Sequence, residues 1–216
     1  MLIRGKIVLL QVQIYIISIK LTNKTKKIMA KVYEFIAPGT EEIEALTVVD
    51  VLRRAGIDIQ TVSILPTPEV TMSHGVTIVC DTTIGDADLS DADMLLLPGG
   101  LPGATNLNDC QPLREALLNQ DAAGKKYGAI CAAPLVLGSL GLLNGKRATC
   151  YPGFEDQMTG AEYTAEIYTI DGNTITGCGP AATLPYSYAI LEMLGYGDEA
   201  AALREGMMFN KLMASE

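Results

Sequence analysis

Cys131 is the residue whose type and position best suit covalent chemistry. It directly follows an apolar, strand-like run, and the small residues Ala132 and Ala133 let the chain turn sharply into a predicted helix. A helix N-terminus offers free N–H groups and positive partial charge, and both favour a thiolate and lower the pKa of a cysteine. The pattern therefore predicts a reactive cysteine, with a small buried core cysteine as the open alternative.

A glutamate on an earlier helix could assist this thiol. Thr40 is expected to cap a helix that runs to about Ala55 and ends at Gly56. Glu44 falls on the apolar face of that helix, four residues before Val48, so we expect it to lose contact with water and its pKa to rise. Such a carboxyl could donate a hydrogen bond to a thiolate or move a proton; a carboxylate facing solvent is the alternative.

A glycine pair and the single histidine complete the candidate site. Gly99 and Gly100 follow a short apolar strand, and adjacent glycines allow backbone N–H groups to hold an oxyanion; an ordinary tight turn is the alternative. His74 lies in a Ser-His-Gly turn that could reach a site in its own or a neighbouring subunit, although a lone histidine more often has no such role.

The composition limits the class of protein. The chain has 216 residues, of which 49% are hydrophobic, and this suits one domain with a sizeable core. A net charge of −9 argues against nucleic acid as a partner, because an acidic surface repels phosphate. The five cysteines form no CxxC pair and no zinc-like spacing with the one histidine, so we expect neither disulfides nor a metal. Reduced cysteines fit a cytoplasmic protein.

The first 28 residues differ from the rest, because they contain no Asp or Glu and include an apolar stretch at 7–19. No small-residue cleavage site follows this stretch, and it is shorter than the ~20 residues of a membrane-spanning helix. We expect residues 1–28 to be an extension outside the fold, with translation starting at Met29 and no membrane partner. Membrane targeting and an added strand are the alternatives. The folded domain is expected over residues 29–216.

Strand and helix patterns alternate from residue 29 onward. Such alternation predicts an α/β sandwich of three layers, with a mainly parallel sheet and helices on both faces. Ligand sites in such folds lie beyond the carboxyl ends of the strands, which here are the turns at 37–40, 98–100 and 130–133. Strands are expected at 32–36, 59–64, 70–72, 76–80, 94–97, 127–130, 147–150, 163–168 and 174–176, and helices at 40–55, 112–120, 133–140, 183–194 and 198–213.

Five segments occur in an order and spacing that are specific, although each is weak alone. They are APGTEEIE at 37–44, VDVLRRAG at 49–56, LPGG at 97–100, AICAAP at 129–134 and GP at 179–180. From residue 29 to the C-terminus the chain thereby resembles the ThiJ/PfpI superfamily, and within it the branch of the parkinsonism-associated deglycase and its bacterial relatives.

The resemblance implies a flavodoxin-like fold, a homodimer and no cofactor. It implies that Cys131 is the nucleophile, that Glu44 hydrogen-bonds it, and that Gly100 and Ala132 supply the amides of an oxyanion hole. The implied activity is that of a glyoxalase or deglycase acting on methylglyoxal, glyoxal or their adducts. Redox sensing or chaperone function through oxidation of Cys131 is the alternative, and a cysteine peptidase ranks last.

Two departures from the pattern of that branch bear on the site. Tyr151 stands where a histidine is frequent, which excludes a Cys-His dyad from that position and leaves a hydroxyl that could bond a substrate oxygen. His74 stands where relatives often have arginine, in a segment that the resemblance places at the dimer interface.

Overall fold

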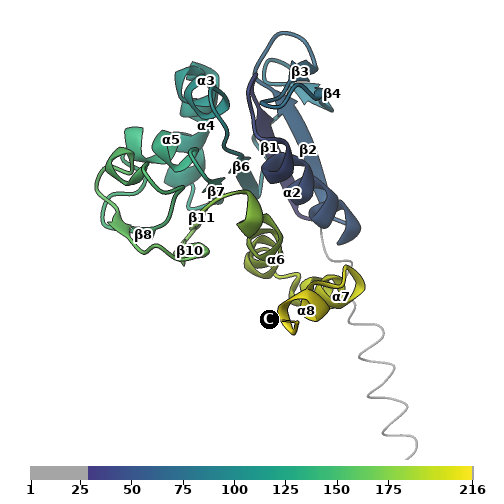
Figure 1. Ribbon diagram of the computed structural model, residues 1–216. Coiled ribbons are helices and arrows are strands. Elements are labelled where there is room, and N and C mark those ends of the chain that lie inside the picture. Colours follow the sequence, from purple (N-terminus) through teal and green to yellow (C-terminus); the bar gives the residue numbers. More distant parts are fainter. Residues whose placement is uncertain (1–28, 216) are drawn as a thin grey trace, which may run out of the picture.

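A sheet of seven strands forms the middle layer of the fold, in the order β10-β11-β7-β6-β1-β2-β5 (Figure 1). The computed structural model describes residues 29–215, and the prediction for residues 1–28 lies outside them. Neighbouring strands run parallel except β10 and β11, so the prediction of a mainly parallel sheet is confirmed. The strands are β1 (Lys31–Ile36), β2 (Asp58–Ser63), β5 (Thr82–Thr83), β6 (Met94–Leu97), β7 (Lys126–Ile130), β10 (Tyr168–Asp171) and β11 (Thr174–Gly177).

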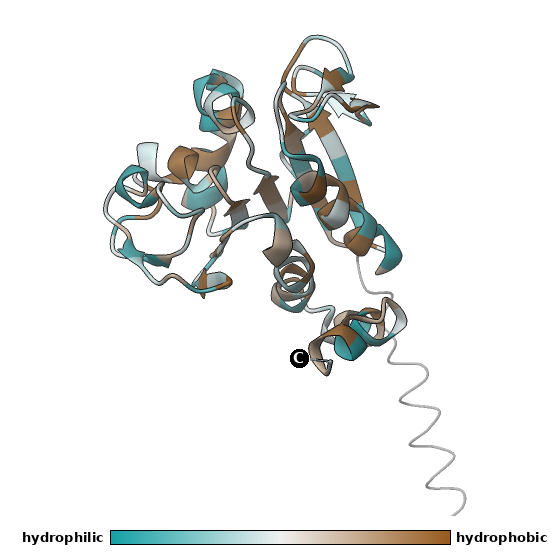
Figure 2. Ribbon diagram, viewed as in Figure 1, coloured by the Kyte–Doolittle hydropathy of each residue, from teal (hydrophilic) through white to brown (hydrophobic). Residues whose placement is uncertain are grey.

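Helices cover both faces of this sheet (Figure 1). On one face α2 packs against α6, and on the other α4 and α5 contact β7. Strands coloured as hydrophobic lie between helices whose outer sides are hydrophilic, as a buried sheet requires (Figure 2). None of the described helices is long and apolar enough to cross a bilayer. The helices are α2 (Glu42–Arg54), α3 (Gly103–Asp109), α4 (Gln111–Ala122), α5 (Pro134–Ser139), α6 (Thr183–Met193), α7 (Gly197–Gly206) and α8 (Phe209–Met213).

Two small sheets lie outside the central one. The predicted hairpin around His74 is present as β3 (Glu69–Thr71) and β4 (Thr77–Val79). The prediction of a strand at 147–150 is wrong in extent, since only β8 (Arg147–Ala148) forms. This short strand pairs with β9 (Glu162–Tyr163). Thr149 instead donates its backbone N–H to the side chain of Thr176 at 2.8 Å, and this side-chain contact ends the ladder.

Three further expectations need correction. Thr40 does not cap α2: its hydroxyl accepts from the N–H of Ala37, and the Glu41 carboxylate caps the helix by accepting from the N–H of Glu44 at 2.8 Å. The strand expected at 163–168 does not form as one piece, because β10 begins only at Tyr168. The helix expected at 198–213 breaks at Met208, whose φ is 63°, so that α8 folds back onto α6.

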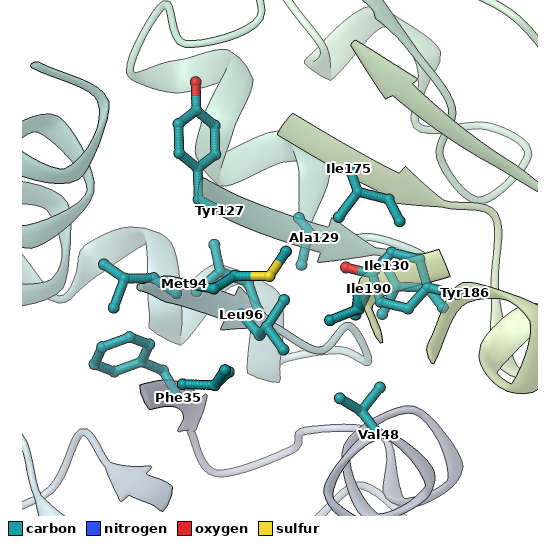
Figure 3. Close-up of a cluster of buried hydrophobic side chains, with 14 of the residues drawn as sticks. Phe35, Val48, Met94, Leu96, Tyr127, Ala129, Ile130, Ile175, Tyr186 and Ile190 are labelled. Carbon is teal, nitrogen blue, oxygen red and sulfur yellow. The ribbon is translucent and has the colours of Figure 1, made fainter. Parts of the chain in front are cut away.

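Tyr186 shows how tightly α6 is packed on the sheet. Its ring enters the apolar core beside Ile130 and Ile190 (Figure 3). A Cβ atom at Gly128 of β7 would lie 2.6 Å from the Tyr186 hydroxyl, so the absence of a side chain there makes room for that group. The hydroxyl is buried and has no hydrogen-bond partner within the described part of the chain.

Glu34 is a carboxyl buried in the middle of the same sheet. It lies on β1 between Thr61 and Leu96, is 1% exposed, and one of its oxygens has no hydrogen-bond partner among residues 29–215. Burial raises the pKa of Glu34 well above its ordinary value, with the charge of Arg53 opposing and that of Glu44 adding to the rise. The folded protein therefore keeps a proton on Glu34 that the unfolded chain releases at neutral pH.

We expect the Glu34→Gln variant to be more stable than the wild type, by a margin that grows with pH. An unfolded glutamate loses its proton above about pH 4.3, so holding the proton in the fold lowers the free energy of unfolding by roughly 1.4 kcal/mol per pH unit from there upward. The amide carries no such proton. Urea unfolding of both proteins between about pH 5 and 8 measures the difference in slope. Parallel slopes would show that Glu34 ionises in the fold.

Candidate active site

The candidate site lies where the winding of the sheet changes direction. The chain passes from β1 to β2 on one side, whereas β6 lies on the other side of β1. In parallel sheets ligands bind outside the carboxyl ends of the strands at such a point. The turns that follow β1, β6 and β7 lead to Glu44, Gly99 and Cys131 respectively.

Cys131 occupies a sharp turn between β7 and α5. Its φ of 64° is a left-handed conformation that residues other than glycine rarely adopt, and it is 8% exposed. Its N–H donates to the carbonyl of Gly177 at 2.9 Å, and its carbonyl accepts from the N–H of Tyr151 at 2.8 Å. Strain held in place by neighbouring segments is typical of functional sites, and here it lies on the predicted nucleophile.

Glu44 is fully buried next to this turn. Its Oε2 accepts from the N–H of Gly99 at 2.8 Å, which fixes the carboxyl. Its Oε1 has no hydrogen-bond partner in the described chain, and the carboxyl as a whole interacts with the thiol of Cys131. Burial raises the pKa of Glu44 to about 7, against the opposing effects of Cys131 and the Gly99 N–H, in agreement with the expected rise.

The expected lowering of the Cys131 pKa is wrong. Burial, followed by the charge of Glu44, raises the pKa of Cys131 to about 12, and the N–H groups of Gly100 and Ala132 oppose this only in part. The helix expected to supply positive charge, α5, begins only at Pro134 and has six residues. With a pKa of about 7 for Glu44 and about 12 for Cys131, the pair holds two protons below about pH 7 and one above it. Above that pH the ionised Glu44 is a base beside the protonated thiol.

Gly99 and Gly100 lie against both reactive groups. A Cβ atom on Gly99 would lie 2.7 Å from the Cβ of Cys131 and 2.7 Å from Oε2 of Glu44, so only glycine fits there. The N–H groups of Gly100 and Ala132 interact with the Cys131 thiol in a way that lowers its pKa. Such N–H groups beside the sulfur could stabilise an oxygen that develops negative charge there.

We expect the Gly99→Ala variant to react with iodoacetamide at Cys131 at least about tenfold more slowly, because its methyl group displaces the thiol or the carboxyl from their shared geometry. Mass spectrometry of the alkylated Cys131 peptide over time measures the rate. Gly197→Ala is the matched control, since a methyl group at Gly197 meets nothing within 4 Å. Equal rates in all three proteins would show that this contact does not set the geometry of the pair.

Tyr151 lies beside the site. Its backbone holds the carbonyl of Cys131, and its ring lies against Gly179, where a Cβ atom would approach the ring to 3.2 Å. The side chain is 46% exposed, so the hydroxyl is open to a molecule that approaches from solvent.

His74 lies at the outer rim and does not join the pair. Its Nδ1 is 2.7 Å from a carboxylate oxygen of Glu42, and this pairing raises the pKa of His74. It lines a surface pocket of about 560 Å³ together with Glu41 and Pro180. No hydrogen bond connects it to Cys131 in residues 29–215.

The polar network around Glu42 was missed by sequence reasoning. Glu42 accepts from the hydroxyl of Ser73 at 2.8 Å and from the N–H of His74 at 2.6 Å, which ties the β3–β4 hairpin to the start of α2. Ligand atoms of Glu41, Glu42 and His74 lie within 4.8 Å of one another, a spacing that could suit a cation. Since Glu42 and His74 already bond each other, we assign the cluster a structural role. No local spacing in the sequence links the two segments.

Known proteins resemble both the sequence and the fold. The model of the DJ-1/PfpI family matches residues 30–193. Protein DJ-1 homolog B of Arabidopsis thaliana is 40% identical over 82% of this chain, and the glutathione-independent glyoxalase DJR-1.2 of Caenorhabditis elegans is 34% identical over 71% of this chain and 82% of its own length. The chain spans about two fifths of the length of the Arabidopsis relatives.

A solved structure of oxidized Toxoplasma gondii DJ-1 superposes with a TM-score of 0.80 at 33% identity, covering 83% of this chain and 98% of that one. The fold is therefore flavodoxin-like, as expected, and the resemblance that the five short segments carry is confirmed over most of residues 29–215. The chain belongs to the DJ-1/PfpI family.

Proposed function

We propose that the protein is a cofactor-free glyoxalase that converts methylglyoxal to lactate with Cys131 as nucleophile and Glu44 as proton carrier. The observation that carries the proposal is a buried carboxyl, with its pKa raised to about 7, that interacts with a thiol held in a strained backbone conformation. The family membership and the glyoxalase named among the relatives support the reaction class.

The geometry suits each proton transfer of that reaction. Glu44 takes the proton of Cys131 while the sulfur adds to the aldehyde carbon, and the N–H groups of Gly100 and Ala132 stabilise the oxygen that gains charge. In the resulting hemithioacetal Glu44 moves a proton from the former aldehyde carbon to the neighbouring carbon. Water then cleaves the thioester, which releases lactate and restores the thiol. The exposed side chain of Tyr151 beside the turn supports a role for its hydroxyl in bonding an oxygen of the substrate.

The test is lactate formation from methylglyoxal by the reduced protein, without glutathione. Lactate is expected to accumulate, and prior alkylation of Cys131 is expected to stop it. Methylglyoxal adducts of an amine and of a thiol, supplied in parallel, distinguish a glyoxalase from a repair enzyme that acts on adducts directly. The absence of lactate from all substrates would overturn the proposal.

Redox sensing through Cys131 is the second candidate function. Its support is a cysteine in a strained turn beside a carboxyl that can hydrogen-bond an oxidised sulfur, and the likeness to a structure described as oxidized. Mass spectrometry after mild peroxide tests it, and oxidation spread evenly over the five cysteines would count against it. A peptidase ranks last, because the one histidine, His74, pairs with Glu42.

We also propose a homodimer, as the family resemblance implies. The exposed apolar side chains of Ile43 and Leu46 on α2 and of Val76 and Val79 on the hairpin support it, because such a group favours an interface. Light scattering is expected to give twice the mass of the chain, and Val79→Lys to shift the protein toward the monomer. A monomeric wild type would refute it.

A further inference from the structure

Cys131 and Cys178 directly follow two neighbouring strands at the carboxyl end of the sheet. Ile130, the last residue of β7, pairs with Gly177, the last residue of β11, in parallel register, so each cysteine is the first residue after its strand. The N–H of Cys131 donates to the carbonyl of Gly177 at 2.9 Å and holds the two segments together. Neighbouring strands lie ~4.8 Å apart, which puts the two Cα atoms close to the ~4.4–6.8 Å that a disulfide spans.

Both thiols lie in the field of the same carboxyl. Burial is the largest cause of the raised pKa of Cys131 and of Cys178, and the negative charge of Glu44 raises both pKa values further. Cys178 is only partly buried, whereas Cys150, whose thiol interacts electrostatically with Cys178, is 0% exposed. Cys178 is therefore the more accessible thiol beside the nucleophile.

The two remaining cysteines lie elsewhere. Cys80 belongs to a small core cluster with Ile36 and Ala45, and Cys110 separates α3 from α4. Cys131, Cys150 and Cys178 are thus the three cysteines that converge on the site, and they come from three separate segments.

We propose that Cys178 is a resolving cysteine, which attacks Cys131 after a hydroperoxide has oxidised it and closes a Cys131–Cys178 disulfide. The inference rests on the proposed role of Cys131 as the reactive thiol of this site. A disulfide formed at this stage is reversible and prevents further oxidation of Cys131 to the sulfinic acid.

Atoms and electrons balance in both steps of this oxidation. The Cys131 sulfur passes its proton to Glu44 and attacks an oxygen of the hydroperoxide; an S–O bond forms, the O–O bond breaks, and the alcohol, or water from hydrogen peroxide, leaves with that proton. The Cys178 sulfur then attacks the sulfur of Cys131; an S–S bond forms, the S–O bond breaks, and water leaves with the proton of Cys178. The peroxide gains two electrons, and the two thiols lose them.

Peptide mapping of the intact protein tests the assignment. The reduced chain is treated with one equivalent of hydrogen peroxide, alkylated, and digested without reductant. The wild type is expected to yield a Cys131–Cys178 cross-linked peptide pair and to lose two hydrogen atoms in mass. Cys178→Ser is expected to gain oxygen on Cys131 instead, and Cys110→Ser, a matched control outside the site, to form the same cross-link as the wild type.

A cross-link to Cys150, or equal oxygen uptake on Cys131 in the wild type and in Cys178→Ser, would overturn the proposal. Lactate formation by the reduced wild type from the same preparation separates this outcome from a failure of the proposed function. If lactate forms but the cross-link does not, only the resolving role is refuted. If Cys131 neither forms lactate nor oxidises, both are refuted.

Discussion

The Cys131→Ser variant is expected to lose lactate formation from methylglyoxal, with kcat/KM lowered at least about 1,000-fold. Serine has nearly the size of cysteine, but its hydroxyl holds its proton far more firmly than a thiol does. A carboxylate whose conjugate acid has a pKa of about 7, as Glu44 has, is too weak a base to remove that proton. Steady-state lactate production by the two purified proteins measures the effect.

The control for this prediction is Cys110→Ser, which makes the same chemical change between α3 and α4, away from the site. It is expected to keep the rate of the wild type. Circular dichroism verifies that both variants are folded. If Cys131→Ser were as active as the wild type, the reaction would have to take place at another group, and the assignment of the nucleophile would be wrong.

The architecture and the meeting of Cys131 with Glu44 could be predicted from the sequence, because both follow from short-range patterns. Apolar runs mark β1, β6 and β7, and their carboxyl ends meet at one edge of a parallel sheet. The apolar face of α2 must turn toward that sheet, and Glu44 lies on this face. The placement of the pair follows from these two facts.

The charge state of the pair could not be predicted in the same way. Position before a helix suggested a lowered pKa for Cys131, but burial and the charge of Glu44, a residue distant in the chain, outweigh the nearby N–H groups. The approach of Cys178 was missed for a similar reason, since it depends on the register of β11 against β7. Register and burial are set by the whole fold, and no local spacing reports them.

The Glu44→Gln variant is expected to lower kcat by about 10²–10⁴-fold, the usual contribution of a positioned acid or base. An amide keeps the shape of the side chain and can still accept the hydrogen bond from Gly99, so the geometry of the turn persists. It can neither take the proton of Cys131 nor return it to the substrate. Glu42→Gln is the matched control, because it removes a carboxyl from the same helix without touching the thiol.

The pH dependence gives the sharper test of the same residue. In the wild type, protonated Glu44 leaves no base at low pH, so kcat/KM should rise with pH through about 7, the raised pKa of Glu44. The rate should then stay level, because the pKa of Cys131 is raised to about 12 and the pair keeps its single proton. In Glu44→Gln the negative charge beside the thiol is gone, so the pKa of Cys131 falls, while burial still holds it above the ordinary value of about 8.5. The residual rate should therefore rise only at the higher pH at which the thiol itself ionises. An unchanged rise near pH 7 in this variant would mean that another group titrates there, and Glu44 would have no part in the proton transfer.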